Sequence, residues 1–77
     1  MKQAKIWDGT DYRFSDVQKE KINGCIVKAR ISDNDGKYAV ERTVYKDDKG
    51  TRCVQIHMGV FATIDYYKNI GKMVEVY

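Results

Sequence analysis

Three short segments rich in Asp and Gly divide this chain into runs of alternating apolar and polar residues. They are Asp8-Gly9, residues 33–36 (Asp-Asn-Asp-Gly) and residues 47–50 (Asp-Asp-Lys-Gly). Asp-Gly and related pairs supply the positive φ angles that tight hairpin turns require. Between such turns, a period of two is typical of strands that bury one face. The chain is therefore predicted to form a small antiparallel sheet.

Length and composition indicate a single domain over residues 1–77. Hydrophobic residues make up 43% of the chain and charged residues 32%, a balance typical of a folded protein rather than a disordered one. No segment approaches the ~20 apolar residues of a membrane span. Met1 is not followed by the apolar run of a secretory leader. We therefore expect a cytoplasmic protein that does not associate with membranes.

The charge distribution limits the classes of partner. The formal net charge is +3, from 14 Lys and Arg against 11 Asp and Glu, and no run of five like charges occurs. Long-range attraction to nucleic acid is weak at this charge, so any phosphate contact has to come from a local arrangement of cations.

Alternation and helix signals assign most of the chain to short elements. Residues 4–7 and 10–14 are predicted to form a hairpin, residues 25–32, 38–45 and 53–58 a three-stranded meander, and residues 72–77 a last strand. Ser15 and Gln18 have the spacing of a helix N-cap. This predicts a turn or two of helix over residues 19–22, ended by Asn23-Gly24. The predicted class is α+β, with the sheet packed against one short helix.

Residues 60–70 allow two interpretations. Apolar residues at positions 60, 61, 64, 67 and 70 fall on one helical stripe, and Gly71 is a suitable helix stop. Thr63 is a suitable N-cap, and Asp65 would face the positive end of the helix. The segment is also rich in strand formers, and positions 60, 62, 64 and 66 alternate, so a strand stays open. We favour a helix that begins near Thr63.

One face of the predicted meander carries polar side chains from all three strands. It is expected to gather Lys28 and Arg30, Thr43 and Tyr45, and Gln55 and His57. Cations, hydroxyls and amides contact phosphates and base edges, and the turn cations Lys46, Lys49 and Arg52 are placed to reach a DNA backbone. The same pattern describes the solvated side of a half-buried sheet, and Glu41 on this face favours that simpler interpretation.

No residue pattern typical of catalysis or metal binding withstands inspection. Cys53 and His57 are four residues apart on one predicted strand, which is ~13 Å and too far for a nucleophile and its base. The 33–36 turn has Val44 where a calcium loop requires its bidentate Glu. We therefore expect no enzymatic activity, no metal and no cofactor. Cys25 and Cys53 are expected to be free thiols, although a disulfide between the two strands stays open.

Three segments carry a resemblance to a known family. They are residues 35–40 (Asp-Gly-Lys-Tyr-Ala-Val), residues 45–52 and residues 59–63 (Gly-Val-Phe-Ala-Thr). Over about residues 24–70 the chain resembles the three-stranded-sheet-plus-helix DNA-binding domains of phage and transposon integrases and of plant ethylene-response-type factors. In that family a Gly-x-Phe-x-Thr element ends the third strand and opens the helix. The resemblance implies a sheet inserted into the major groove of DNA, with contacts from Arg30, Arg42, Thr43, Tyr45, Arg52 and Gln55.

The chain departs from that family in several places. Tyr38 and Ala39 stand where a Trp is common, Glu41 is acidic, Gly71 cuts the helix short, and the N-terminal hairpin has no counterpart. These departures put the DNA-contacting role of the second strand in doubt.

These observations predict a small non-enzymatic module that binds duplex nucleic acid as an accessory or regulatory factor. The alternative is a protein-binding module or inhibitor, such as a protein of a phage or other mobile element that docks on a host enzyme complex. Aromatic side chains are enriched at such interfaces, and the candidates are Trp7, Tyr12, Tyr66 and Tyr77. An edge strand can pair with a partner's sheet or with a second copy, so a homodimer stays open.

Overall fold

The computed structural model describes residues 11–13 and 17–77, and for residues 11–13 it describes the backbone alone. Most of the hairpin expected over residues 4–14 lies outside this range. In chain order the elements are β1 (Asp11–Arg13), β2 (Gln18–Lys19), β3 (Lys21–Ile22), β4 (Cys25–Ile26), β5 (Lys28–Ser32), β6 (Ala39–Lys46), β7 (Arg52–His57), β8 (Val60–Thr63), α1 (Ile64–Asn69) and β9 (Met73–Val76). The predicted α+β class, an antiparallel sheet with one short helix, is confirmed.

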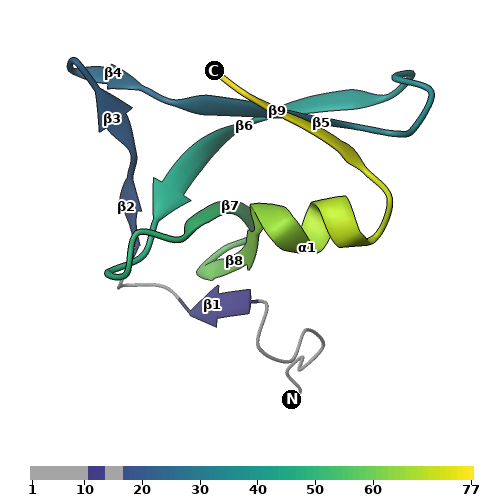
Figure 1. Cartoon of the computed structure of the whole chain (residues 1–77). Coiled ribbons are helices and arrows are strands. Elements are labelled where there is room, and N and C mark those ends of the chain that lie inside the picture. Colours follow the sequence, from purple (N-terminus) through teal and green to yellow (C-terminus); the bar gives the residue numbers. More distant parts are fainter. Residues whose placement is uncertain (1–10, 14–16) are drawn as a thin grey trace.

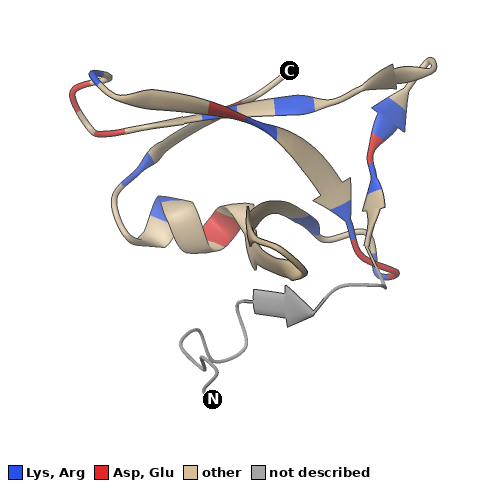
Figure 2. Cartoon of the chain, turned by 180° about the vertical axis from the view of Figure 1, so that it is seen from behind, with Lys and Arg blue, Asp and Glu red and all other residues tan. Residues whose placement is uncertain are grey.

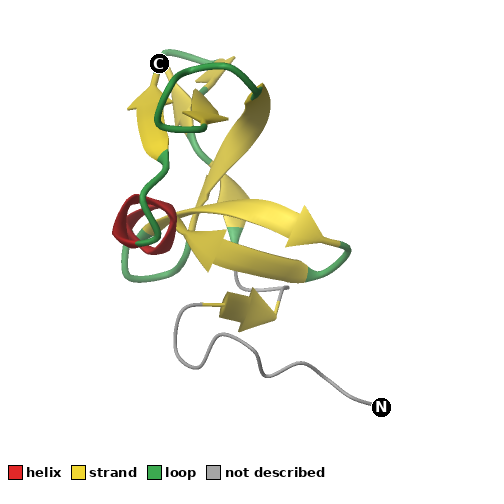
Figure 3. Ribbon diagram, turned by 90° about the vertical axis from the view of Figure 1, so that its right-hand side faces the viewer, coloured by secondary structure: helices red, strands yellow, loops and turns green. Residues whose placement is uncertain are grey.

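The long strand β6 joins two layers of sheet. Its first half pairs with β5, from Ala39 opposite Ser32 to Thr43 opposite Lys28. Its second half pairs through its other edge with β7, starting at Val44. β9 extends the first layer beside β5, and β8 and β1 extend the second beside β7 (Figures 1 and 3). The predicted meander is confirmed in order, but β6 bends, so β5, β6 and β7 do not form one flat surface.

The core lies between these two layers. Its buried side chains are Val27, Ala29, Ile31, Val44, Val54 and Ile64, and Tyr67, Val74 and Val76 pack against them. Alternation predicted the inward direction of Val27, Ala29 and Ile31, and burial confirms it. Cys25, predicted on the same face, is instead exposed. The reason is that the predicted strand 25–32 is interrupted at Val27, where β4 ends and β5 begins.

The helix predicted over residues 19–22 is wrong, because this segment forms strands β2 and β3. Asn23 and Gly24 have φ angles of 54° and 82° and form the turn between β3 and β4. Two successive positive φ angles are typical of the tight hairpin turn that Asn-Gly favours. The segment offers only one apolar residue per helical turn, so local propensity had no packing to support it.

Three strands meet at the base of the β3–β4 hairpin. The Glu20 N–H donates to the Val44 carbonyl (2.9 Å), the Val44 N–H to the Val27 carbonyl (2.9 Å) and the Val27 N–H to the Glu20 carbonyl (3.0 Å). This closed ring of backbone hydrogen bonds lets β2 and β5 share one edge of β6. The β3–β4 hairpin then projects from the body of the molecule (Figure 1).

Helix α1 begins where the sequence predicted. The Tyr66 N–H donates to Thr63 Oγ1 (3.0 Å), and Asp65 lies in the first turn. Gly71, with φ of 89°, follows the last turn and donates to the Lys68 carbonyl. The strand interpretation of residues 60–70 is therefore correct for residues 60–63, which form β8, and the helix interpretation is correct for residues 64–69. Among the described residues no helix is long and apolar enough to cross a membrane.

Candidate nucleic-acid interface

A polar hollow of about 210 Å³ lies on the outer side of the sheet, where β6 bends away from β7. It is lined by Lys28, Glu41, Arg42, Thr43, Tyr45 and Gln55. All of these except Glu41 belong to the set that the sequence predicted to bind nucleic acid. The hollow therefore brings together half of that predicted set, taken from β5, β6 and β7.

Strand register explains why these side chains meet. Val44 is fully buried, so its neighbours Thr43 and Tyr45 point to the outer face of β6. Lys28 is the cross-strand partner of Thr43, and partners share a face. The pairing of β6 with β7 ends at Val44 and Val54. Thr43 and Gln55 would form the next pair, and their separation opens the hollow.

Packing holds Tyr45 at the wall of the hollow. Its ring meets the ring of buried Phe61 in a T-shaped arrangement, with 4.8 Å between the centroids. Such pairs prefer this edge-to-face geometry. The Cys53 thiol donates to the Tyr45 carbonyl at 3.7 Å, which adds a weak restraint on the backbone. Tyr45 therefore lines the hollow from a restrained position.

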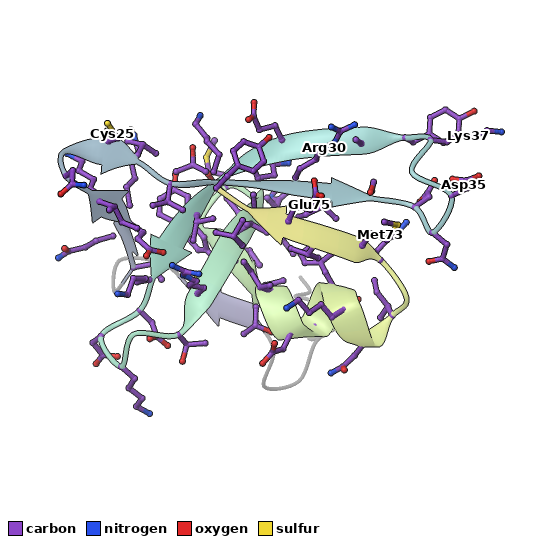
Figure 4. The ribbon with its side chains drawn as sticks, turned by 45° about the horizontal axis from the view of Figure 1, so that its top comes forward. Cys25, Arg30, Asp35, Lys37, Met73 and Glu75 are labelled. Carbon is purple, nitrogen blue, oxygen red and sulfur yellow. The ribbon has the colours of Figure 1, made fainter. Side chains whose placement is uncertain are left out.

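Carboxylates offset the cations on the outer face. Arg30 lies opposite Glu41 on β6 and opposite Glu75 on β9. Figure 4 labels Arg30 and Glu75 on their neighbouring strands. The Tyr77 hydroxyl donates to Glu41 Oε2 (2.9 Å), and this hydrogen bond raises the pKa of Tyr77. Over the described chain, Lys and Arg alternate with Asp and Glu along the strands and turns rather than forming one basic band (Figure 2).

Arg42 faces the inner side of the sheet, as the cross-strand partner of Ala29. It is nevertheless exposed, because the second layer does not cover this part of β6. An open groove of about 200 Å³ lies there, lined by Ile31, Ser32, Asp33, Tyr38, Val40, Arg42, Tyr67 and Lys72. Arg42 thus borders both the polar hollow and the inner groove.

Five predicted site residues do not line the hollow: Arg30, which lies opposite Glu41, and four that lie elsewhere. Lys46 ends β6 and Lys49 lies in the following turn. The Arg52 guanidinium donates to both carboxylate oxygens of Glu20, each at 2.8 Å. His57 was predicted to share a face with Gln55, and this is wrong. A bulge after Gln55 pairs His57 with Val60 instead, which turns its side chain to the opposite face.

Of the four aromatic residues of the alternative interface, the structure describes the side chains of Tyr66 and Tyr77, which lie on α1 and just after β9. Trp7 lies outside the described residues, and Tyr12 belongs to β1, of which only the backbone is described. Tyr66 is half-buried on α1 and meets the Tyr67 ring at 5.5 Å. Tyr77 is 60% exposed and follows β9.

Sequence reasoning missed the exposed apolar side chains around the inner groove. Val40 is 46% exposed although it lies on the nominally apolar face of β6, and Tyr38, just before that strand, is 73% exposed. The sequence did contain a sign that this part of β6 is not buried, because Arg42 interrupts the apolar alternation between Val40 and Val44. A cation at an inward position indicates that the core ends there.

Both cysteines are free, which answers the question of a disulfide between them. Cys25 is exposed on β4 and Cys53 is buried on β7. Burial raises the pKa of the Cys53 thiol to about 11, and the charge of Asp47 adds to the effect. Within residues 17–77 no group of three or more His, Cys, Asp or Glu side chains is arranged to hold a metal ion.

Comparison with known proteins gives no significant match to a family model, to a curated protein or to a solved structure.

Proposed function

We propose that this protein is a small non-enzymatic module that binds nucleic acid through the polar hollow. The observation that supports it is the convergence of Lys28, Thr43, Tyr45 and Gln55 on that hollow. An ammonium group, two hydroxyls and an amide are the donors that proteins use for phosphate oxygens and base edges. The resemblance of residues 24–70 to the integrase-type domains points to the same class of ligand.

The four donors have separate roles in this proposal. The Lys28 ammonium neutralises a phosphate, and the Thr43 and Tyr45 hydroxyls fix its position. The Gln55 amide is both a donor and an acceptor, so it suits the edge of a base. Glu41 opposes the approach of a phosphate, and Arg30 beside it offsets part of that charge. Binding is therefore expected to be weak and to depend on a few local contacts.

The test is a titration of labelled duplex DNA, with single-stranded DNA and RNA of the same sequence in parallel. Each is measured by fluorescence anisotropy at low and at physiological salt. Affinity for the duplex should fall with salt, with a log–log slope of about −0.9 for each phosphate contacted. Absence of binding to all three at low salt would contradict the proposal.

Two lysine variants locate the binding surface. Lys28→Ala removes the cation of the hollow, and Lys68→Ala removes an exposed cation on α1, so the change in net charge is the same. Lys28→Ala should weaken binding and reduce the salt slope by about 1, whereas Lys68→Ala should change little. Glu41→Gln should strengthen binding, because it removes the opposing charge. Equal losses from both lysine variants would indicate attraction to net charge alone.

A second candidate function, protein binding, is favoured by the apolar side chains exposed at one end of the sheet. Tyr38 and Val40 border the inner groove. Ile70, 50% exposed, lies beside the 33–35 turn, and Met73, 48% exposed, pairs with Ser32. Exposed apolar residues that lie together often mark protein interfaces, and Tyr38 and Val40 share the wall of one groove.

A further inference from the structure

The first half of β6 has one paired edge and one open edge. The N–H and C=O groups of Val44 both point to the β5 side, where they bond to Val27 and Glu20. Along a strand these groups alternate between edges. Those of Ala39, Glu41 and Thr43 therefore point to the other edge. In the described part of the chain no strand pairs with that edge over residues 39–43, since β7 pairs only from Val44 onward.

A hollow lies on each side of this open edge. On the outer side, Glu41 and Thr43 border the polar hollow. On the inner side, Val40 and Arg42 border the groove whose walls include Ile31 and Tyr67. Side chains of an added strand would point alternately to these two sides. An open edge supplies main-chain hydrogen bonds and pockets for alternate side chains supply specificity, which is the combination found where peptides add to sheets.

We propose that an extended peptide segment of a partner protein adds to the open edge of β6 as an antiparallel strand. The residue opposite Val40 is apolar or aromatic and enters the inner groove. The residue opposite Arg42 is acidic, and the one opposite Glu41 is basic, because opposite charges stabilise cross-strand pairs. The central peptide residue exchanges two hydrogen bonds with the Glu41 backbone.

Charge argues against a second copy of this chain as the occupant. A symmetric antiparallel pair of β6 edges places one residue opposite itself. When that residue is Glu41 two carboxylates face one another, and when it is Arg42 two guanidinium groups do. Like charges directly opposite destabilise a strand pair, and charged residues on an edge are a common protection against self-association. Registers centred on Val40 or Thr43 avoid these like-charge pairs but form no pair of opposite charges, whereas a partner with the complementary pattern forms two.

The probe is the capped peptide Thr-Glu-Lys-Phe-Thr, titrated into the 15N-labelled full chain and followed by amide chemical shifts. In the proposed register its Glu faces Arg42, its Lys faces Glu41 and its Phe faces Val40. The largest shifts should appear at the outward amides of Ala39, Glu41 and Thr43, and these amides should become protected from hydrogen exchange. Shifts centred on another element, or none at millimolar peptide, would overturn the proposal.

Three control peptides separate strand addition from general attraction. Exchanging the Glu and Lys should weaken binding about fivefold or more, because both cross-strand charge pairs become repulsive. Methylating the Lys backbone nitrogen removes a hydrogen bond to Glu41 and should weaken binding about tenfold or more. Methylating the Phe nitrogen, which points away from β6, should have a much smaller effect. Equal binding by all four peptides would overturn the proposal.

This proposal stands apart from nucleic-acid binding, and its failure can be recognised separately. Val40→Ala removes a contact of the peptide in the inner groove, so it should weaken peptide binding while it leaves nucleic-acid affinity unchanged. Peptide-induced shifts that lie at Lys28, Tyr45 and Gln55 instead of the edge would count against strand addition. Concentration-dependent shifts of residues 39–43 without peptide would show that a second copy takes the edge, and would also overturn the proposal.

Discussion

Glu20 is 7% exposed, and both of its carboxylate oxygens accept hydrogen bonds from Arg52. The carboxylate lies at the three-strand junction, where its backbone also pairs with Val27 and Val44. The hydrogen bond from Arg52 holds the pKa of Glu20 below its ordinary value of 4.5, against the opposing effect of desolvation. Because Arg52 is 42% exposed, solvent screens the pair.

Glu20→Gln is expected to lower the free energy of unfolding by about 1 kcal/mol at neutral pH. A carboxylate whose folded pKa lies below its unfolded pKa stabilises the protein above the unfolded value. That stability is lost as the pH falls through the folded pKa. The difference between wild type and Glu20→Gln should therefore shrink on acidification below about pH 4.5. Urea unfolding at several pH values measures it, and a pH-independent difference would contradict the assignment.

The two thiols are expected to differ in reactivity towards iodoacetamide at pH 8. The thiolate is the reactive form, and burial both shields Cys53 and raises its pKa to about 11. Exposed Cys25 should be alkylated in the folded protein and Cys53 only after unfolding. Mass spectrometry should find one adduct on the native chain, two in denaturant and none on native Cys25→Ser. Rapid modification of native Cys53 would show that β7 is less protected than described.

At the scale of elements, short-range signals located α1 well. Thr63, Asp65 and Gly71 act through hydrogen bonds and charges within a few residues of the helix. The Asn23-Gly24 pair is equally local, but it is compatible both with a helix stop, as predicted from the sequence, and with the hairpin turn that the structure has. Both interpretations agree with the preference of Gly for positive φ. Only the pairing of β3 with β4 distinguishes them.

Thr63→Ala should destabilise the protein by about 1 kcal/mol, because the Tyr66 N–H loses its side-chain acceptor. Thr63→Ser keeps a hydroxyl at the same position and should retain most of the stability. The free energies of unfolding of the two variants, from urea titrations, provide the comparison. If Ala and Ser are equivalent at this position, the cap does not contribute to stability.

At the scale of the molecule, the bend of β6 decides what each side chain of that strand does. Val40 and Val44 share a face, but Val44 is fully buried between the layers and Val40 is 46% exposed beside the groove. The same bend opens the polar hollow on the outer side and leaves the strand edge over residues 39–43 unpaired.

These two valines form a matched pair for testing the position of the core. Val44→Ala should cost about 2 kcal/mol, since it removes buried methyl groups and leaves a cavity. Val40→Ala should cost about 0.5 kcal/mol or less. Denaturant unfolding of both variants measures the difference. Equal costs would place the core further along β6 than the structure does.

Part of the polar hollow could be predicted from the sequence. Alternation placed Thr43 and Tyr45 on one face of their strand and Lys28 on one face of its neighbour, because the side-chain period of a strand is local. His57 could not be placed, since the bulge after Gln55 depends on pairing with β8. The groove beside Val40 could not be foreseen either, because it depends on how far the second layer extends.

The amino-acid sequence alone determined the α+β class, the order of the three central strands and the start of the helix. Turn chemistry, side-chain alternation and helix capping act over a few residues, so they can be read along the chain. Only the tertiary structure decided the bend of β6, the junction of Glu20, Val27 and Val44, and the open edge that follows from both. These features arise from hydrogen bonds between segments distant in the chain, and a one-dimensional pattern does not specify which edge of a strand each partner takes.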